Sequence, residues 1–123
     1  MSILNNCIRG KPVDQLHSAM RTAIESQTLY FRNNNKHICE LCGSSSHIHV
    51  DHFEPQFIDL KNNFLSMCDI QRPKSFTHNN SNAKMFKNKD KDFKNSWYNY
   101  HKKHAILRIL CSKCNLVRKK SKR

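Results

Sequence analysis

The sequence predicts a small α+β fold in a single domain, and three observations lead to this prediction. The chain has 123 residues, which is long enough for one domain with a modest core. Its apolar residues recur at helical spacing in some segments and gather in short β-branched runs in others. Two Cys-x-x-Cys pairs, Cys39/Cys42 and Cys111/Cys114, can join distant segments through a metal. Because only 37% of the residues are apolar, we expect such a cross-link to support the core.

The elements are expected in the order helix, strand, helices, strand, helix. Pro12 suits a first helical turn, and the stripe of apolar residues behind it predicts an N-terminal helix. Gly43 allows the tight turn of the first cysteine knuckle. The stretch 69–89 is rich in Asn, Lys and Ser and is expected to be largely loop, which Phe76 and Phe86 can pin to the body. Within one domain, 1–123, the units are the N-terminal helix (12–31), the first knuckle with its Asp-His strand (38–62), a helical and loop insertion (63–104), and the second strand, knuckle and metal-binding helix (105–120).

The charge of the chain points to a nucleic-acid partner. With 22 Lys and Arg against 9 Asp and Glu, the net charge is +13, and such a field attracts polyanions. A solvated basic surface is the alternative; a membrane is not expected, because no apolar run is long enough to span one. The residues expected to contact DNA phosphates are Arg108, Arg118, Lys119 and Lys120, the last three forming a basic tail that could instead be merely solvated.

The N-terminus predicts a reducing, intracellular location. Residues 1–10 lack the charged start and apolar stretch of a secretory signal, so the cysteines should be thiols rather than disulfides. The location expected is the cytoplasm, or the nucleus or virus factory if the host is eukaryotic. The Asn- and Lys-rich composition hints at an AT-rich coding genome and therefore at a phage or large virus.

Between and behind the cysteine pairs stand residues that can carry chemistry. Asp51 and His52 lie between the two pairs, and Asn115 directly follows the last cysteine. Oxygen ligands such as those of Asp51 and Asn115 suit magnesium or manganese, whereas four thiolates suit zinc, so two metals of different character are expected. Each of these residues also has a purely structural alternative. His52 could be an ordinary histidine whose hydrogen bonds are made by its neighbours, Asp51 could orient a neighbouring side chain by a hydrogen bond, and Asn115 could cap the last helix.

These motifs together resemble the HNH (His-Me finger, ββα-metal) endonucleases in their zinc-bearing form. The resemblance rests on Cys-x-x-Cys, then Val-Asp-His with Pro55 three residues on, then Leu-Cys-x-x-Cys-Asn opening a helix, and it covers about a third of the chain. The order of the active-site residues is similar to that in phage junction-resolving endonucleases. The chain departs from the compact motif in the long gap from His52 to Cys111, in Ile106 where many members have Asn, and in Asn115 where the name of the family has its final histidine.

The resemblance implies a metal-dependent endonuclease that hydrolyses DNA phosphodiester bonds. It implies that Asp51 and Asn115 hold a catalytic magnesium, that His52 is the general base, and that Cys39, Cys42, Cys111 and Cys114 hold a structural zinc. His47, His49, His101 and His104 are expected to support neighbouring residues or to contact phosphate rather than to act in catalysis.

Two other classes of function remain open from the sequence. One is a zinc-stabilised nucleic-acid-binding module without catalysis; the other is a zinc-bridged protein-interaction domain, which leaves the Asp-His pair unexplained. The partners expected are DNA and, as a further option, a second copy of the chain in a homodimer or a larger nuclease assembly. The motif does not set the DNA specificity, since homing, junction resolution, restriction and degradation all use this catalytic unit.

Overall fold

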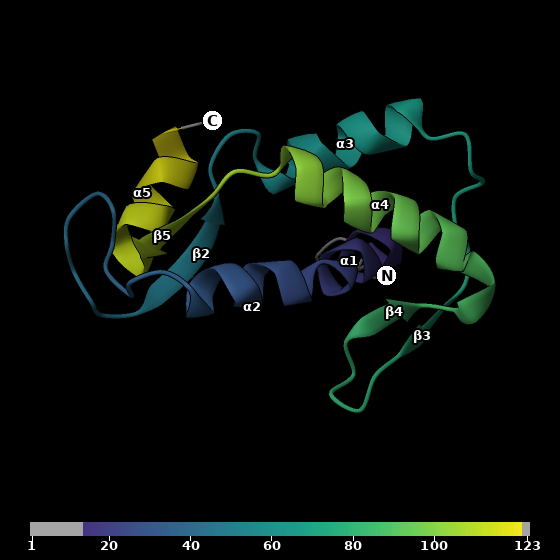
Figure 1. Ribbon diagram of the computed structural model, residues 1–123, viewed down its shortest axis with the longest axis horizontal. Helices are drawn as coiled ribbons and strands as arrows, with labels where there is room; N and C mark the ends of the chain where they lie inside the picture. Colours follow the sequence, from purple (N-terminus) through teal and green to yellow (C-terminus); the bar gives the residue numbers. More distant parts are fainter. Residues whose placement is uncertain (1–13, 122–123) are drawn as a thin grey trace, which may run out of the picture.

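A group of packed helices and a two-stranded sheet lie along the long axis of the computed structural model (Figure 1), which describes residues 14–121, with side chains as far as Val117. The elements in chain order are α1 (Gln15–Ala23), α2 (Glu25–Asn33), β2 (Ile48–His52), α3 (Phe57–Met67), β3 (Phe76–His78), β4 (Lys84–Phe86), the 3₁₀ turn η1 (Asn88–Asp90), α4 (Lys91–His104), β5 (Leu107–Cys111) and α5 (Ser112–Ser121). Strands β2 and β5 form one small sheet and β3 and β4 another. The fold is therefore α+β in a single small domain, as the sequence predicts.

The N-terminal helix differs from the one expected over 12–31. It consists of two helices, α1 and α2, which meet at Ile24, where φ is −106° and ψ is 9°. Ile24 is buried at 3% exposure and its N–H bonds to Arg21 O at 3.2 Å, which ends α1. Asp14 caps α1 by accepting the His17 N–H at 3.1 Å, whereas residues 12 and 13 lie outside the described part of the chain. Apolar spacing predicted the helical segment, but it cannot register a break at one residue.

The expected loop 69–89 contains a hairpin. Strands β3 and β4 pair antiparallel with Phe76 opposite Phe86, and the ring centroids of these two residues are 6.0 Å apart. Phe86 is buried and belongs to the helical core, so the two rings do pin the segment to the body. Strands of three residues leave too short a pattern to be recognised in a polar sequence.

Two hydrophobic clusters hold the molecule together. The larger lies among α1, α3, α4 and β4, and its buried members are Ala19, Met20, Ile24, Phe57, Leu60, Phe64, Phe86, Phe93 and Trp97. Trp97 is fully buried, and its Nε1–H donates to Met20 O at 2.8 Å, which joins α4 to α1. The smaller cluster, around the β2–β5 sheet, consists of Cys39, Ile48, Ile109, Leu110 and Cys111. The sheet therefore has only a few apolar residues of its own.

The register of the β2–β5 sheet sets which motif residues meet. Asp51 lies opposite Arg108, and Ile48 lies opposite Cys111. Helix α5 starts at Ser112, directly after β5 and three residues earlier than expected, and it packs against β2. The residue after the last cysteine, Asn115, therefore falls in the first turn of α5 beside the end of β2.

None of the helices in the described part of the chain has the length and apolar character needed to cross a bilayer.

Candidate functional site

The four cysteines of the two pairs form one cluster. The Sγ atoms of Cys39, Cys42, Cys111 and Cys114 all lie within 4.8 Å of one another. The Cys42 and Cys111 sulfurs are 3.6 Å apart, well beyond a disulfide bond of about 2.05 Å. A tetrahedron of thiolates with zinc–sulfur bonds of about 2.3 Å has sulfurs roughly 3.8 Å apart. The cluster is therefore compatible with a structural zinc ion.

The backbone fixes the first knuckle and joins it to the sheet. Gly43 has φ of +79°, a left-handed conformation that favours glycine, and its N–H donates to Cys39 O at 2.9 Å. This confirms the turn expected at Gly43. Glu40 makes two hydrogen bonds to Ile109 of β5. Its backbone N–H donates to Ile109 O at 2.9 Å, and its Oε2 accepts the Ile109 N–H at 3.0 Å.

Electrostatics in the four-cysteine cluster favour a bound cation. Burial opposes ionisation of Cys39, but backbone N–H groups of Cys111, Cys42 and Leu41 outweigh burial and lower the pKa of Cys39 to about 6. The neighbouring thiols Cys111 and Cys42, together with burial, raise the pKa of Cys114 to about 12. Without a metal, the four sulfurs thus cannot all be thiolates near neutral pH. A divalent cation supplies the charge that lets all four ionise.

A cleft of about 210 Å³ brings the three predicted catalytic residues together. It lies where the two hydrophobic clusters meet, since Phe57 of the helical core forms one side and residues of β2 form the other. Its lining residues are His17, Arg21, Val50, Asp51, His52, Gln56, Phe57, Ile58 and Asn115. Asp51, His52 and Asn115 thus come from the end of β2 and the first turn of α5.

Asp51 is buried and paired with Arg108. Its exposure is 4%, and its Oδ2 accepts the Arg108 Nε–H at 3.1 Å across the sheet. The Arg108 guanidinium also lies over the Phe53 ring, 4.2 Å from the centroid, and only 13% of its side chain is exposed. Arg108 was predicted to contact DNA phosphates; the structure gives it a role as the partner of Asp51, and its contact with DNA stays a prediction.

Asn115 has a buried oxygen that lacks a partner. Its Oδ1 makes no hydrogen bond with any residue in the described part of the chain. Asn115 is not the cap of α5, the structural alternative, because the helix begins at Ser112. A buried amide oxygen left unpaired costs roughly 1–3 kcal/mol. Since Asn115 lines the cleft together with Asp51, a cation bound beside this oxygen would satisfy it.

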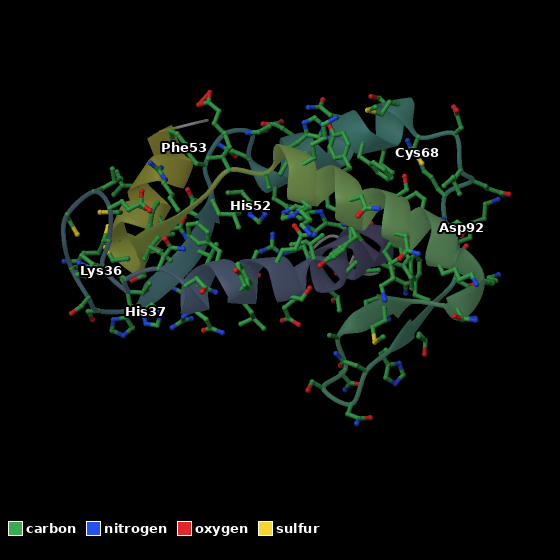
Figure 2. All side chains as sticks on the ribbon, in the orientation of Figure 1. Lys36, His37, His52, Phe53, Cys68 and Asp92 are labelled. Atoms are coloured by element: carbon green, nitrogen blue, oxygen red, sulfur yellow. The ribbon has the colours of Figure 1, made fainter. Side chains whose placement is uncertain are left out.

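His52 is held from the side of α4. It is 7% exposed, and its Nε2 lies 2.8 Å from Nε2 of the fully buried His101. Its ring also packs edge-on against Phe57, with centroids 5.2 Å apart. Figure 2 shows His52 between the ribbon of β2 and that of α4. Burial, His52 and Arg21 lower the pKa of His101 to about 4, so His101 is neutral near pH 7.

Helix α1 contributes two cleft residues that the sequence analysis missed. The Arg21 guanidinium lies over the Phe57 ring, 4.7 Å from the centroid, and His17 packs edge-on against the same ring. Lys61 Nζ is 3.2 Å from His17 Nδ1. Burial, Lys61 and Arg21 lower the pKa of His17. The spacing of four residues puts His17 and Arg21 on one helix face, but nothing in the sequence says that this face meets the Asp-His strand.

The remaining residues that the sequence predicts to contact DNA or to support the site are exposed or have side chains outside the described part of the chain. His47, His49 and His104 are exposed. The side chains of Arg118, Lys119 and Lys120 lie outside the described part of α5, so their contact with DNA stays a prediction. A larger cavity of about 590 Å³ lies between α2 and α4, but Asp51, His52 and Asn115 do not line it. The smaller cleft is therefore the candidate site.

Comparisons with known proteins give no relative of this chain. No protein-family model matches the sequence, no curated protein matches it, and no solved structure matches the fold. The resemblance to HNH endonucleases therefore rests on the motif residues alone.

Proposed function

We propose that this protein is a metal-dependent endonuclease that hydrolyses DNA phosphodiester bonds in the cleft of Asp51, His52 and Asn115. The observation that carries the proposal is the buried Asn115 Oδ1, which has no hydrogen-bond partner in the described structure. Asn115 lines the cleft together with the carboxylate of Asp51 and the imidazole of His52. These are the groups that metal-assisted phosphodiester hydrolysis needs.

The oxygen atoms of the cleft fit a small divalent cation. Asp51 and Asn115 would hold magnesium or manganese, since both ions prefer carboxylate and amide oxygens. When bound, the ion supplies positive charge that stabilises the phosphate and the leaving oxygen. Arg108 holds one carboxylate oxygen of Asp51 at 3.1 Å and thereby fixes the orientation of this ligand.

The chain's own residues perform the remaining steps. His52 takes the proton from the attacking water as general base, a role that suits an imidazole near neutral pH. Arg21 and His17 line the cleft from α1, where a guanidinium and an imidazole N–H can bind the oxygens of the phosphodiester. Phe57 contacts His17, Arg21 and His52 and so keeps the two sides of the cleft in a fixed relation.

The rest of the molecule supports this chemistry. A net charge of +13 attracts DNA and raises its concentration near the cleft. A structural zinc in the four-cysteine cluster would join the first knuckle to the start of α5, the helix that carries Asn115. The metal site and the cleft are thus linked through α5.

Nicking of supercoiled plasmid in the presence of magnesium tests the proposal. We expect His52→Ala to lower the single-turnover rate by roughly 100-fold or more, with zinc content and DNA binding close to wild type. Asn115→Ala should raise the magnesium concentration needed for half-maximal cleavage. Asn99→Ala, an exposed asparagine on α4, is the matched control and should cleave like wild type. Cleavage by His52→Ala at the wild-type rate would refute the assigned roles.

A second function is favoured by one observation, the ion pair between Asp51 and Arg108. It neutralises Asp51 without a metal, as in a zinc-stabilised DNA-binding module that lacks catalysis. The same assay separates the two functions, because such a module retains DNA but does not nick it at any magnesium concentration.

A further inference from the structure

Behind His52, a chain of hydrogen bonds runs from a buried contact between two histidines to a half-buried glutamine. His52 Nε2 lies 2.8 Å from His101 Nε2, and His101 Nδ1 lies 2.7 Å from Gln27 Oε1. Gln27 Nε2 in turn donates to Tyr98 O at 2.9 Å. His101 is fully buried and in edge-on contact with Trp97, at 5.7 Å between centroids, so its ring is held in place. Strand β2 and helix α2 each contribute one member of this chain, and helix α4 contributes two, His101 and the Tyr98 carbonyl.

The directions of these hydrogen bonds follow from the amide of Gln27. Only an amide nitrogen can donate to the Tyr98 carbonyl, so Gln27 turns its oxygen toward His101. An amide oxygen only accepts, and His101 Nδ1 must therefore carry a proton. Because a buried, neutral imidazole carries only one proton, His101 Nε2 has a lone pair and accepts. The hydrogen bond to His52 is then donated by His52 Nε2–H.

We propose that His101 and Gln27 are positioning residues that fix His52 in the Nε2–H tautomer, which makes Nδ1 the basic atom of His52. This inference rests on the proposed function, in which His52 is the general base. A histidine base works only when its lone pair is on the nitrogen that meets the water, and the partner of the other nitrogen decides this.

The tautomer can be observed directly, without any cleavage. Two-bond ¹H–¹⁵N spectra of the full-length, zinc-loaded protein distinguish a protonated from an unprotonated ring nitrogen. For wild type near pH 7.5, we expect His52 to show a protonated Nε2 and an unprotonated Nδ1. A His52 spectrum of the opposite tautomer would overturn the proposal.

Substitutions at His101 test whether this residue sets the tautomer. His101→Phe keeps a ring but removes the acceptor, and it should give His52 a mixture of tautomers and lower the single-turnover rate roughly 10- to 100-fold with DNA binding unchanged. His101→Gln can still accept from His52 and should restore most of the rate and the wild-type spectrum. His104→Phe, on the exposed side of the same helix, is the matched control and should alter neither. A wild-type His52 spectrum in folded His101→Phe would overturn the proposal.

Gln27→Leu tests the same chain without changing either histidine. It removes the oxygen that accepts from His101 Nδ1, so both rings should lose their fixed tautomers. This variant therefore tests the proposal even if His101→Phe does not fold. An unaltered His52 spectrum in Gln27→Leu would contradict the proposal. Failure of the proposed function gives a different result: the wild-type protein would show the expected tautomer of His52 and nick no DNA.

Discussion

Removal of one cysteine from the four-cysteine cluster should destabilise the whole sheet. In Cys111→Ser, we expect loss of the bound zinc and of the cross-link between the first knuckle and β5. Cys42 and Cys111 are separated by 69 positions in the sequence, and closing a loop of this length costs about 4 kcal/mol of chain entropy. The free energy of zinc binding to the folded chain would offset this cost. The small cluster around the sheet cannot replace the zinc, because its buried apolar members besides cysteines are Ile48, Ile109 and Leu110, with Phe31 and Val50 packed against them and only partly buried.

The expected effect is large enough to measure by simple methods. A loss of about 4 kcal/mol corresponds to a fall in Tm of roughly 15–20 °C for a domain of this size. Thermal unfolding followed by circular dichroism, with and without a chelator, gives the Tm, and elemental analysis gives the zinc content. Chelation of the wild-type protein should have the same effect as the substitution.

Cys68→Ser is the matched control for this experiment. Cys68 lies outside the four-cysteine cluster, and its Sγ is 3.9 Å from Ile70 O. We expect this variant to bind one zinc per chain and to unfold near the wild-type Tm. Folded wild-type protein without zinc, or Cys111→Ser with an unchanged Tm, would refute the structural role of the cluster.

Three further predictions concern charge. DNA binding should weaken roughly 100-fold between about 50 and 200 mM salt if about four phosphates are neutralised, as fluorescence anisotropy can measure; salt-insensitive binding would contradict the role of the +13 charge. Arg108→Ala removes the Arg108 cation from the buried Asp51 carboxylate and should cost roughly 3 kcal/mol in urea unfolding, whereas Arg108→Lys should cost less. The folded pKa of His101, about 4, lies below its ordinary value of 6.5, so the unfolded chain binds this proton first and stability falls as pH drops from 6.5 toward 4. Wild type should therefore lose more stability than His101→Gln between about pH 7 and pH 4.5 by urea unfolding, and an equal loss would exclude His101 as the cause.

The sequence by itself determined the fold class and the residues of the four-cysteine cluster. Two cysteines with two residues between them must share one turn, so each pair is a local feature. Four thiolates in a chain expected to be reduced have few uses other than binding a metal. Helical stripes and the strand around Asp51 are also local, because they depend on spacing within about a dozen residues. The grouping of Asp51 and His52 with Asn115 could also be predicted. Asn115 directly follows Cys114, the strand with Asp51 and His52 comes shortly after Cys42, and a metal shared by the four cysteines would hold these two segments together.

Only the tertiary structure decided how the cleft is built. The partners of His52 and Asp51 are 49 and 57 positions away, and Gln27 is 74 positions from His101, so these contacts depend on how the helical core docks against the sheet. Composition cannot show that His101 is fully buried while His104, one turn later, is exposed. Nor can spacing show that Arg108 faces Asp51, because this follows from the register of β2 and β5. Local patterns select the elements, but packing between distant elements determines which polar groups share a site.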